Sequence, residues 1–427
     1  MLSFDMLSVL FTGFSAGSTP ITAMRSRKLH LVYHVVNLHQ AAYNSDEFFR
    51  GDSAGNMEYK LDCVYYLGEK PCRFKRLCMG CPEYKPMGTR ILILKLGAMG
   101  DALRTTPVLS AIRRTYSHTH ITWLTDRTSL PILQLNPEID YLGLLEPSDM
   151  NIILGQHFHL LLSLDKAIPA IAFAMQVQAD QRRGYAMSPY GTLDVFNDAA
   201  LYSLALGLDD DLKFNHNAKT YQQTIHELCE IDYRRDPYVF QLPDESRSEA
   251  ARIIENLTLR GQGPRIGLNT GCGDVFATKK WPDKHFVELA RLLHHELDAR
   301  VFFLGGAAER ASNRRMVDEV GDIAAEVGAH PLNVFAGLLH QMDIVVTGDT
   351  MALHLAIAVQ TPVVGLFGPT CHQEIDFYDL GQPLVVSDSC APCYRRTCVR
   401  AISCMHSLTP RLVAETVKKL FLKGPDR

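Results

Sequence analysis

The chain has 427 residues, of which 47% are hydrophobic and 21% are charged, and its formal net charge is −4. Because the charges form no long blocks of one sign, the sequence lacks the basic pattern of a nucleic-acid-binding protein. No apolar run is as long as the roughly 20 residues that are needed to span a bilayer. The length suits two domains that each bury a core, so we expect a soluble globular protein with no nucleic-acid partner.

The amino-terminal segment does not have the pattern of a targeting signal. Its apolar patch is interrupted by Asp5, and no Lys or Arg precedes that patch. The segment therefore lacks the charged start of a secretory signal peptide. We interpret residues 1–57 as a poorly determined extension upstream of a candidate start at Met57, and we expect a cytoplasmic protein.

Eight of the eleven cysteines fall into two clusters of four. The clusters are Cys63, Cys72, Cys78 and Cys81, and Cys390, Cys393, Cys398 and Cys404. Four thiols match the ligand count of a tetrahedral metal site, and the closest pair in each cluster suits a tight turn that supplies two ligands. Neither spacing is a clean zinc-ribbon or ferredoxin pattern. A structural zinc, an iron–sulfur cluster, and plain thiols or disulfides remain open, in that order of preference.

Strand-like apolar runs alternate with helical patterns from residue 90 onward. In chain order we expect strands at residues 90–94, 120–124, 158–164, 265–269, 301–304, 343–346 and 362–366. A helix is expected over residues 102–116, and another opens at Trp281 and Pro282. This alternation predicts two open α/β domains in tandem, each with a parallel sheet covered by helices.

Three loops follow the expected strands and are rich in glycine, hydroxyl groups or charge. They are residues 97–106, 270–280 and 347–354. Ligands of open parallel sheets bind beyond the carboxyl ends of the strands. We therefore expect the three loops to face one cleft between the domains, which is typical of an enzyme with two substrates.

The first loop combines two glycines with a carboxylate, Asp101, at the start of a helix. The carboxylate is either an N-cap or a base at the cleft. Glycines let the backbone turn tightly and approach a ligand closely. The loop has neither the G-x-G-x-x-G spacing of a dinucleotide site nor the Gly-Lys-Ser/Thr of a P-loop, which argues against a generic nucleotide site here.

Longer stretches carry a resemblance to a known family. LKLGAMGDALRTTPVLSAIRR and ITWLTD resemble the amino-terminal signature of the heptosyltransferases, glycosyltransferase family nine. The resemblance continues through NTGCGDVFATKKWPDKHFVELARLL, FFLGGAAER and TGDTMALHLAIAVQTPVVGLFGPT, and covers about residues 86–420. The amino-terminal cysteines resemble only a subgroup of that family.

The resemblance implies a GT-B fold, with two facing Rossmann-like, doubly wound parallel-sheet domains. The expected parts are a cysteine-rich segment at residues 58–86, an acceptor domain at 87–240 and a nucleotide-sugar domain at 241–388. Residues 389–427 would hold the second cysteine cluster and a last helix that returns toward the first domain.

The resemblance also implies roles for single residues. Asp101 would be the base that takes a proton from the acceptor hydroxyl, and the product would have inverted stereochemistry. Loop residues on the acceptor side are Gly97, Gly100, Arg104 and Thr105, although a solvent-facing first turn explains Arg104 equally well. Donor-binding candidates are Lys279, Glu309, Thr347, Gly348, Asp349, Thr350 and His354.

For two of these candidates, a purely structural role is an alternative to donor binding. His354 is as well explained as a core histidine, and Glu309 as an exposed acid in the first turn of a helix. The family usually has Gly and Pro where this chain has Met351 and Ala352, which leaves the donor open.

The leading hypothesis is thus an inverting glycosyltransferase that moves a heptose-type sugar from ADP-heptose to a lipopolysaccharide or another cell-surface glycan, at the inner face of the membrane. No cofactor is expected for catalysis, because cationic side chains and helix N-termini can neutralise the leaving diphosphate. One alternative is a transferase that uses another nucleotide-sugar, such as a GDP- or UDP-sugar. The other is a catalytically silent module that binds metal through its cysteines.

Overall fold

The computed structural model describes residues 59–273 and 276–423. The described residues divide into two compact units, one of residues 59–61 with 66–84 and the other of residues 62–65 with 85–273 and 276–423. The interpretation of residues 1–57 as an extension therefore lies outside the described part of the chain. Within that part, no helix is both long and apolar enough to cross a membrane.

The smaller unit consists of turns in its described part. The backbone N–H of Lys75 donates to the carbonyl of Cys72, and that of Cys81 to the carbonyl of Cys78. Cys63 belongs to the larger unit instead, where it forms an isolated bridge with Pro86. The first predicted cysteine cluster is thus divided between the two units.

The first half of the larger unit is built on a sheet with the strand order β3-β2-β1-β4-β5-β6. Its strands are β1 (Thr89–Leu94), β2 (Thr119–Thr125), β3 (Tyr141–Leu144), β4 (His157–Ser163), β5 (Gln178–Met187) and β6 (Leu193–Val195). Its helices are α2 (Met99–Thr105), α3 (Pro107–Thr115), α4 (Leu130–Leu133), α5 (Pro147–Leu154), α6 (Ile168–Ala174), α7 (Leu201–Ala205) and α8 (Tyr221–Leu228), with short turns η1 (Asp198–Ala200) and η2 (Leu212–His216). Only β6 pairs antiparallel in this sheet.

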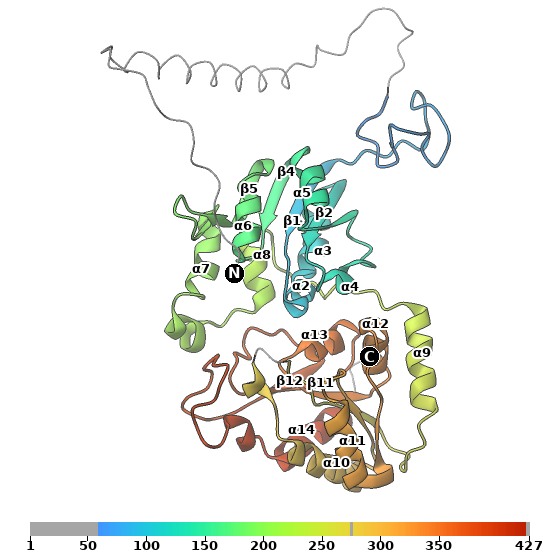
Figure 1. Ribbon diagram of the computed structural model, residues 1–427, viewed down its shortest axis with the longest axis vertical. Coiled ribbons are helices and arrows are strands. Elements are labelled where there is room, and N and C mark those ends of the chain that lie inside the picture. Colours follow the sequence, from blue (N-terminus) through green and yellow to red (C-terminus); the bar gives the residue numbers. More distant parts are fainter. Residues whose placement is uncertain (1–58, 274–275, 424–427) are drawn as a thin grey trace, which may run out of the picture. The chain divides into compact units, whose positions relative to one another are not determined.

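The second half is built on a parallel sheet with the order β12-β11-β10-β7-β8-β9. Its strands are β7 (Arg265–Asn269), β8 (Arg300–Leu304), β9 (Ala324–Glu326), β10 (Ile344–Gly348), β11 (Val363–Phe367) and β12 (Gly381–Val385). Its helices are α9 (Asp244–Glu255), α10 (Asp283–Leu297), α11 (Arg310–Val320), α12 (Leu332–His340), α13 (Met351–Ala358) and α14 (Pro410–Lys423), with η3 (Ala277–Lys279), η4 (Gly321–Ile323) and η5 (Cys404–Ser407). Figure 1 shows the first half in blue to green and the second in yellow to red.

Both sheets are buried on their two faces, as the apolar runs predict. Each face of β1 enters a different cluster, since Ile91 packs with α3 and Leu92 packs with α5 and α6. The core that contains α3 continues into the second half, because Leu103 of α2 and Leu353 of α13 belong to the same cluster. Helices α2 and α13 are in contact where the two halves meet (Figure 1). The halves thus share buried apolar surface as well as a boundary.

The structure differs from the single helix expected over residues 102–116. Two helices, α2 and α3, are present, and the first begins at Met99. Thr106 lies between them, and Pro107 opens α3. A proline lacks the N–H group that would continue the hydrogen bonding of a helix, so the chain ends α2 at this point and starts again.

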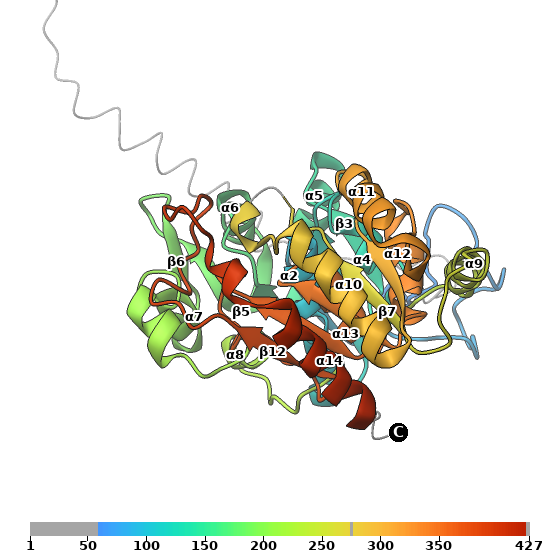
Figure 2. The same ribbon diagram turned by 90° about the horizontal axis from the view of Figure 1, so that it is seen from below.

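The last helix does not return to the first half as expected. Val413, Ala414 and Val417 of α14 are buried in the same cluster as Phe286 and Leu293 of α10. Figure 2 shows α14 beside α10, and α14 also contacts β11. The apolar face of α14 is therefore buried against the second sheet and its helices.

Candidate active site

A cleft of about 970 Å³ lies between the two halves of the larger unit, at the carboxyl ends of their parallel strands. Residues 97–101 line it from the first half, and residues 271–273 and 349–352 line it from the second. The structure therefore brings together parts of the three loops that the sequence singled out. A shared cleft is the arrangement that the chemistry of two substrates needs.

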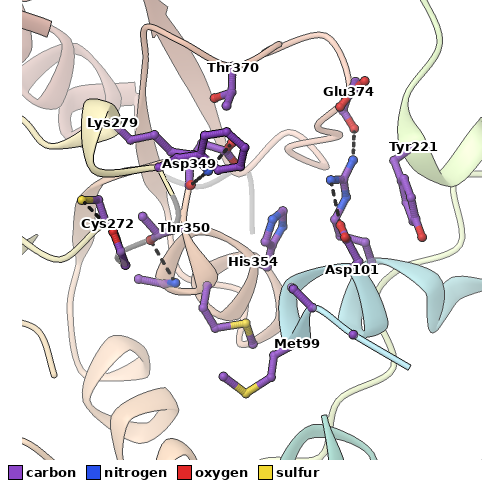
Figure 3. A pocket seen from close by; sticks show the side chains of 18 of the residues that line it. Met99, Asp101, Tyr221, Cys272, Lys279, Asp349, Thr350, His354, Thr370 and Glu374 are labelled. Atoms are coloured by element: carbon purple, nitrogen blue, oxygen red, sulfur yellow. Dashed lines mark hydrogen bonds and ion pairs between the residues drawn. The ribbon is translucent and has the colours of Figure 1, made fainter. Parts of the chain in front are cut away.

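Asp101 projects from the first turn of α2 into this cleft (Figure 3). Its side chain is 43% exposed. The N-cap of α2 is Ala98, and no side chain caps this helix. Asp101 is therefore not an N-cap, although a carboxylate in a first turn is still favoured by the helix dipole. The carboxylate stands at a helix start and is accessible to a ligand.

Arg104 lies one turn later on α2 and is buried. Its Nη1 atom is 3.4 Å from Oδ1 of Asp101, and its Nη2 donates to the carbonyl of Glu374 in the second half at 2.9 Å. Its guanidinium also lies 4.1 Å from the ring centre of Tyr221. Burial alone would lower the pKa of Arg104, but Asp101 leads the charges that raise it. The alternative of a solvent-facing Arg104 is wrong, because this side chain packs between the halves.

Lys95 and Asp165 support the loop beneath Asp101. The Lys95 ammonium donates to the carbonyl of Gly97 at 3.0 Å and pairs with Asp165 at 3.2 Å. The Leu96 N–H donates to the same carboxylate oxygen at 3.0 Å. Both charges are buried, so each needs its partner. Burial works to lower the pKa of Lys95, while Tyr221, Asp165 and Asp101 raise it above its ordinary value.

On the opposite wall, α13 points its amino terminus toward the cleft. Thr350 is its N-cap, and the Thr350 hydroxyl accepts a hydrogen bond from the Ala352 N–H at 3.2 Å. Lys279 donates to the carbonyl of Asp349 at 2.8 Å and pairs with its carboxylate at 3.2 Å. Burial acts to raise the pKa of Asp349, but Lys279 leads the charges that hold it below the ordinary range. Lys279 is thus held at the helix start by an ion pair.

His354 occupies the junction of α13 with α2. It lines the cleft and is only 4% exposed, so it is a buried histidine at the edge of the site, and its role in donor binding stays a prediction. Its Nδ1 lies 3.3 Å from the Tyr238 hydroxyl. Burial lowers the pKa of His354 to about 4, and Arg104 acts in the same direction. A Cβ at Gly100 would lie 3.0 Å from the His354 ring, so a larger residue at this position would require the ring to shift.

Four predicted site residues do not line the cleft. They are Thr105, Glu309, Thr347 and Gly348. The Glu309 carboxylate accepts the Gly306 N–H at 2.9 Å and lies against Gly271, so it shapes a loop that borders the cleft. The Thr105 hydroxyl donates to the Asp101 carbonyl at 2.7 Å. The buried Thr347 hydroxyl accepts a hydrogen bond from the Asn269 side-chain amide at 3.0 Å. These side chains support the loops rather than face the cleft.

Several lining residues went unnoticed in the sequence. They include Lys95, Lys166, Lys213, Tyr221, Glu374 and Tyr394. Lys166 could have been found, because it follows β4, whose carboxyl end belongs to the same sheet edge as that of β1. Lys95 directly follows β1 and precedes the first loop, so the same reasoning finds it. The signals for Lys213, Tyr221, Glu374 and Tyr394 are weak, because these residues are far in sequence from the recognisable loops.

Metal binding by the two cysteine clusters stays a prediction. All eight predicted ligands are unbridged thiols, and no described group of three or more Cys, His, Asp or Glu side chains is placed to hold a metal ion. In the second cluster, burial and the neighbouring Cys390 raise the pKa of Cys404. That loop instead places Tyr394 in the cleft, where its ring stacks on Phe214 at 5.6 Å.

Two α/β halves that face one cleft at the carboxyl ends of their strands form a GT-B fold. A family model described as glycosyltransferase family 9 (heptosyltransferase) matches residues 156–402, more than half of the chain. The chain belongs to glycosyltransferase family 9.

Individual relatives agree with this membership. Lipooligosaccharide heptosyltransferase 2 of Haemophilus influenzae is 24% identical over an alignment of 173 residues, and the match covers 37% of this chain and 50% of that protein. The chain spans half or less of the length of the first curated relatives that it matches.

Solved structures show the same fold. A glycosyl transferase family 9 protein of Veillonella parvula matches with a TM-score of 0.62 and 18% identity, over 79% of this chain and 98% of that one. The ADP-heptose lipopolysaccharide heptosyltransferase II of E. coli matches with a TM-score of 0.56 and 16% identity, over 78% and 99%.

Proposed function

We propose that this protein is an inverting glycosyltransferase that moves a heptose from ADP-heptose to a hydroxyl group of a lipopolysaccharide or another cell-surface glycan precursor. The observation that carries the proposal is that Asp101 and the start of α13 line one cleft from opposite halves (Figure 3). Membership of family 9 supports the reaction type. The similarity to the E. coli ADP-heptose lipopolysaccharide heptosyltransferase II supports the donor.

Asp101 acts as the general base in this proposal. Its partly exposed carboxylate takes the proton of the acceptor hydroxyl while that oxygen attacks the anomeric carbon of the donor. The bond between the anomeric carbon and the diphosphate oxygen breaks in the same displacement, and ADP leaves. Attack from the side opposite the leaving group inverts the anomeric configuration. The base must be held in place for this step, and Arg104 holds it from within the same helix.

The second half stabilises the leaving diphosphate. Backbone N–H groups at the start of α13 offer donors and a positive helix end. Lys279 adds a cation beside them, and its pairing with Asp349 fixes where that charge lies. A charge that is already oriented costs no reorganisation when negative charge develops on the leaving group. Gly271 and Gly273 have no side chains, so the backbone of the neighbouring loop can approach the ligand at these two positions.

The acceptor meets the first half of the cleft, and the lipid part of such an acceptor would place transfer at the inner face of the membrane. Met351 and Ala352 line the donor side where the family has Gly and Pro. This departure makes another nucleotide-sugar the alternative donor.

Calorimetry of the protein with ADP-heptose, a GDP-sugar and a UDP-sugar tests the donor. We expect ADP-heptose to bind most tightly, and tighter binding of either other donor would replace it in the proposal. Asp101→Asn should abolish transfer and leave the donor Kd within about twofold, because the variant keeps the side-chain shape and loses the base. NMR of the product reports its anomeric configuration. Normal turnover by the Asp101→Asn variant, or retention of the anomeric configuration in the product, would refute the mechanism.

A further inference from the structure

The hydroxyl group of Thr370 is buried at the cleft and has no hydrogen-bond partner among the described residues. Thr370 lies in the loop after β11, lines the cleft and is only 4% exposed. Its hydroxyl oxygen makes no hydrogen bond with any described residue. Buried side-chain hydroxyl groups nearly always have a partner, because an unpaired one costs free energy. An unpaired hydroxyl in the wall of a cleft therefore indicates a contact that a ligand completes.

Thr370 stands on the donor side of the cleft. Strands β10 and β11 are parallel neighbours, with Gly348 opposite Leu366, so the residues that follow these strands leave the sheet at the same edge. Asp349 directly follows β10 and pairs with Lys279 at 3.2 Å. Figure 3 shows Thr370 next to these two side chains. Thr370 is thus part of the wall that carries the start of α13.

The Asp349 carboxylate does not satisfy the Thr370 hydroxyl. Burial acts to raise the pKa of Asp349, and Thr370 is one of the groups that, after Lys279 and His354, hold it below the ordinary range. No hydrogen bond joins the two side chains, however. A ligand at this point meets a carboxylate and a hydroxyl group together. Since a carboxylate repels a phosphate but accepts hydrogen bonds from hydroxyl groups, the matching ligand group is a hydroxyl of a sugar.

The loop of the second cysteine cluster holds the Thr370 loop in place. The backbone N–H groups of Cys393 and Tyr394 both donate to the carbonyl of Pro369, at 3.0 and 2.8 Å. The Tyr394 hydroxyl accepts the N–H of Cys371 at 3.2 Å. The residues before and after Thr370 are therefore both bonded to the same short stretch of chain.

Tyr394 is itself anchored on the first half of the larger unit. Its ring is stacked on Phe214 of η2, with the ring centres 5.6 Å apart and the planes 4° apart. The Lys213 ammonium lies 3.9 Å from the centre of the same ring. The Tyr394 hydroxyl also donates to the Glu374 carboxylate at 3.4 Å. With its ring and its hydroxyl both engaged, Tyr394 is a fixed support for the loop that carries Thr370.

We propose that the Thr370 hydroxyl binds a hydroxyl group of the sugar that the donor transfers, and that Tyr394 is a positioning residue that holds Thr370 there. The inference rests on the proposed function for the identity of the ligand as a nucleotide-sugar. Thr370 contributes one neutral hydrogen bond and takes no part in proton transfer. The second cysteine cluster thereby acquires a role in the active site through its backbone and Tyr394.

Calorimetry with ADP-heptose and with ADP alone tests the contact. Thr370→Val removes the hydroxyl and keeps the shape of the side chain. It should weaken binding of ADP-heptose about three- to tenfold, the size of one neutral hydrogen bond, and leave the Kd of ADP within about twofold, because ADP lacks the transferred sugar. Thr370→Ser should restore most of the binding. If another nucleotide-sugar proves to be the donor, that donor and its nucleoside diphosphate take the place of ADP-heptose and ADP.

Thermal unfolding separates a ligand contact from a role in the fold. Thr361 is the matched control, because it is also buried and lies outside the cleft lining, but its hydroxyl donates to the Leu339 carbonyl at 3.0 Å. Without ligand, Thr361→Val should lower the unfolding temperature, since it removes a hydrogen bond, and should bind both ligands like the wild type. Thr370→Val should not lower the unfolding temperature, since its hydroxyl has no partner to lose.

A double-mutant cycle tests the positioning role. Tyr394→Phe keeps the ring on Phe214 and removes the hydroxyl that accepts the Cys371 N–H. This variant should weaken ADP-heptose binding about two- to fivefold. The double variant with Thr370→Val should bind within about twofold of Thr370→Val alone, because Tyr394 acts through Thr370. Fully additive losses would contradict the positioning role.

The outcomes separate this contact from the proposed function. Unchanged donor affinity of Thr370→Val, in a protein that transfers the sugar, refutes the contact and leaves the transferase intact. An equal loss of ADP and ADP-heptose binding also refutes it, because the hydroxyl would then serve the diphosphate. A lower unfolding temperature of unliganded Thr370→Val would show that the hydroxyl is already paired within the fold, which removes the basis of the inference. The expected binding losses in a protein that transfers no sugar keep the contact and overturn the transferase.

Discussion

Replacing Arg104 by Met tests whether the base depends on its buried neighbour. Methionine keeps the length and apolar contact of the side chain against Tyr221 but removes the charge next to Asp101. The Glu374 carbonyl keeps a donor in the variant, because the Tyr221 N–H also bonds it at 2.9 Å. Asp101 is exposed enough to be hydrated without its partner. The variant should therefore fold, and its loss should fall on catalysis.

The expected size of the effect follows from the geometry. Two unit charges 3.4 Å apart interact by about 1 kcal/mol in water and by about 5 kcal/mol at an effective dielectric of about 20. The exposure of Asp101 places this pair toward the lower value, so about 1.5–3 kcal/mol is reasonable for the charge-assisted hydrogen bond. We expect kcat to fall roughly 10- to 100-fold, since about 1.4 kcal/mol corresponds to a factor of ten.

Steady-state kinetics and calorimetry together show where the loss occurs. The Kd for the donor should change by less than about threefold, because Arg104 does not touch the donor-side residues Lys279 and Asp349. Arg104→Lys should recover part of the rate: a lysine can pair with Asp101 but cannot reach the Glu374 carbonyl with a second fork nitrogen. A kcat within twofold of the wild type in Arg104→Met, or an equal loss of donor binding and turnover, would refute the reasoning.

Two further predictions concern buried charges and pH. The pKa of His354 is lowered to about 4. Between about pH 4 and 6.5 the unfolded chain therefore binds more protons than the folded chain. As pH drops through that range, the contribution of His354 should lower the free energy of unfolding by about 3 kcal/mol. Urea unfolding at pH 7 and pH 5 checks this, and an equal pH dependence in His354→Gln would contradict it. The pKa of Asp349 is lowered by Lys279 against the effect of burial, so this pair stabilises the fold above the ordinary carboxyl pKa and the contribution is lost as pH falls below it. Lys279→Met should lower the free energy of unfolding by about 2 kcal/mol at pH 7 and by less at pH 3.5, and an undiminished difference at pH 3.5 would show that the pair is not its origin.

The sequence predicts the parts of the fold whose signal is local. The central strands β1, β4 and β10 each contain a continuous apolar run, so both their type and their buried position could be predicted. The edge strands β3 and β12 are short or mixed in burial and carried no such pattern. Their place comes from pairing with β2 and β11, which is a property of the whole sheet.

The site was predictable to the extent that it lies on loops next to those strands. Asp101 and Thr350 follow strands at the expected sheet edge, and the structure places both in one cleft. Arg104 could not be understood in the same way, because its burial depends on Tyr221 and on the Glu374 carbonyl, 117 and 270 residues further along the chain. A charge with distant partners looks exposed when only its neighbours in sequence are considered.

The backbone carbonyl of Glu374 lies where the two halves meet. It accepts hydrogen bonds from the Arg104 guanidinium and from the Tyr221 N–H. No amino-acid replacement at position 374 can delete a backbone oxygen. The carboxylate of Glu374 is separate from this contact and approaches Lys213 instead. Substitutions at position 374 can therefore change the side-chain charge beside Lys213, while the backbone hydrogen bonds that join the two halves stay in place.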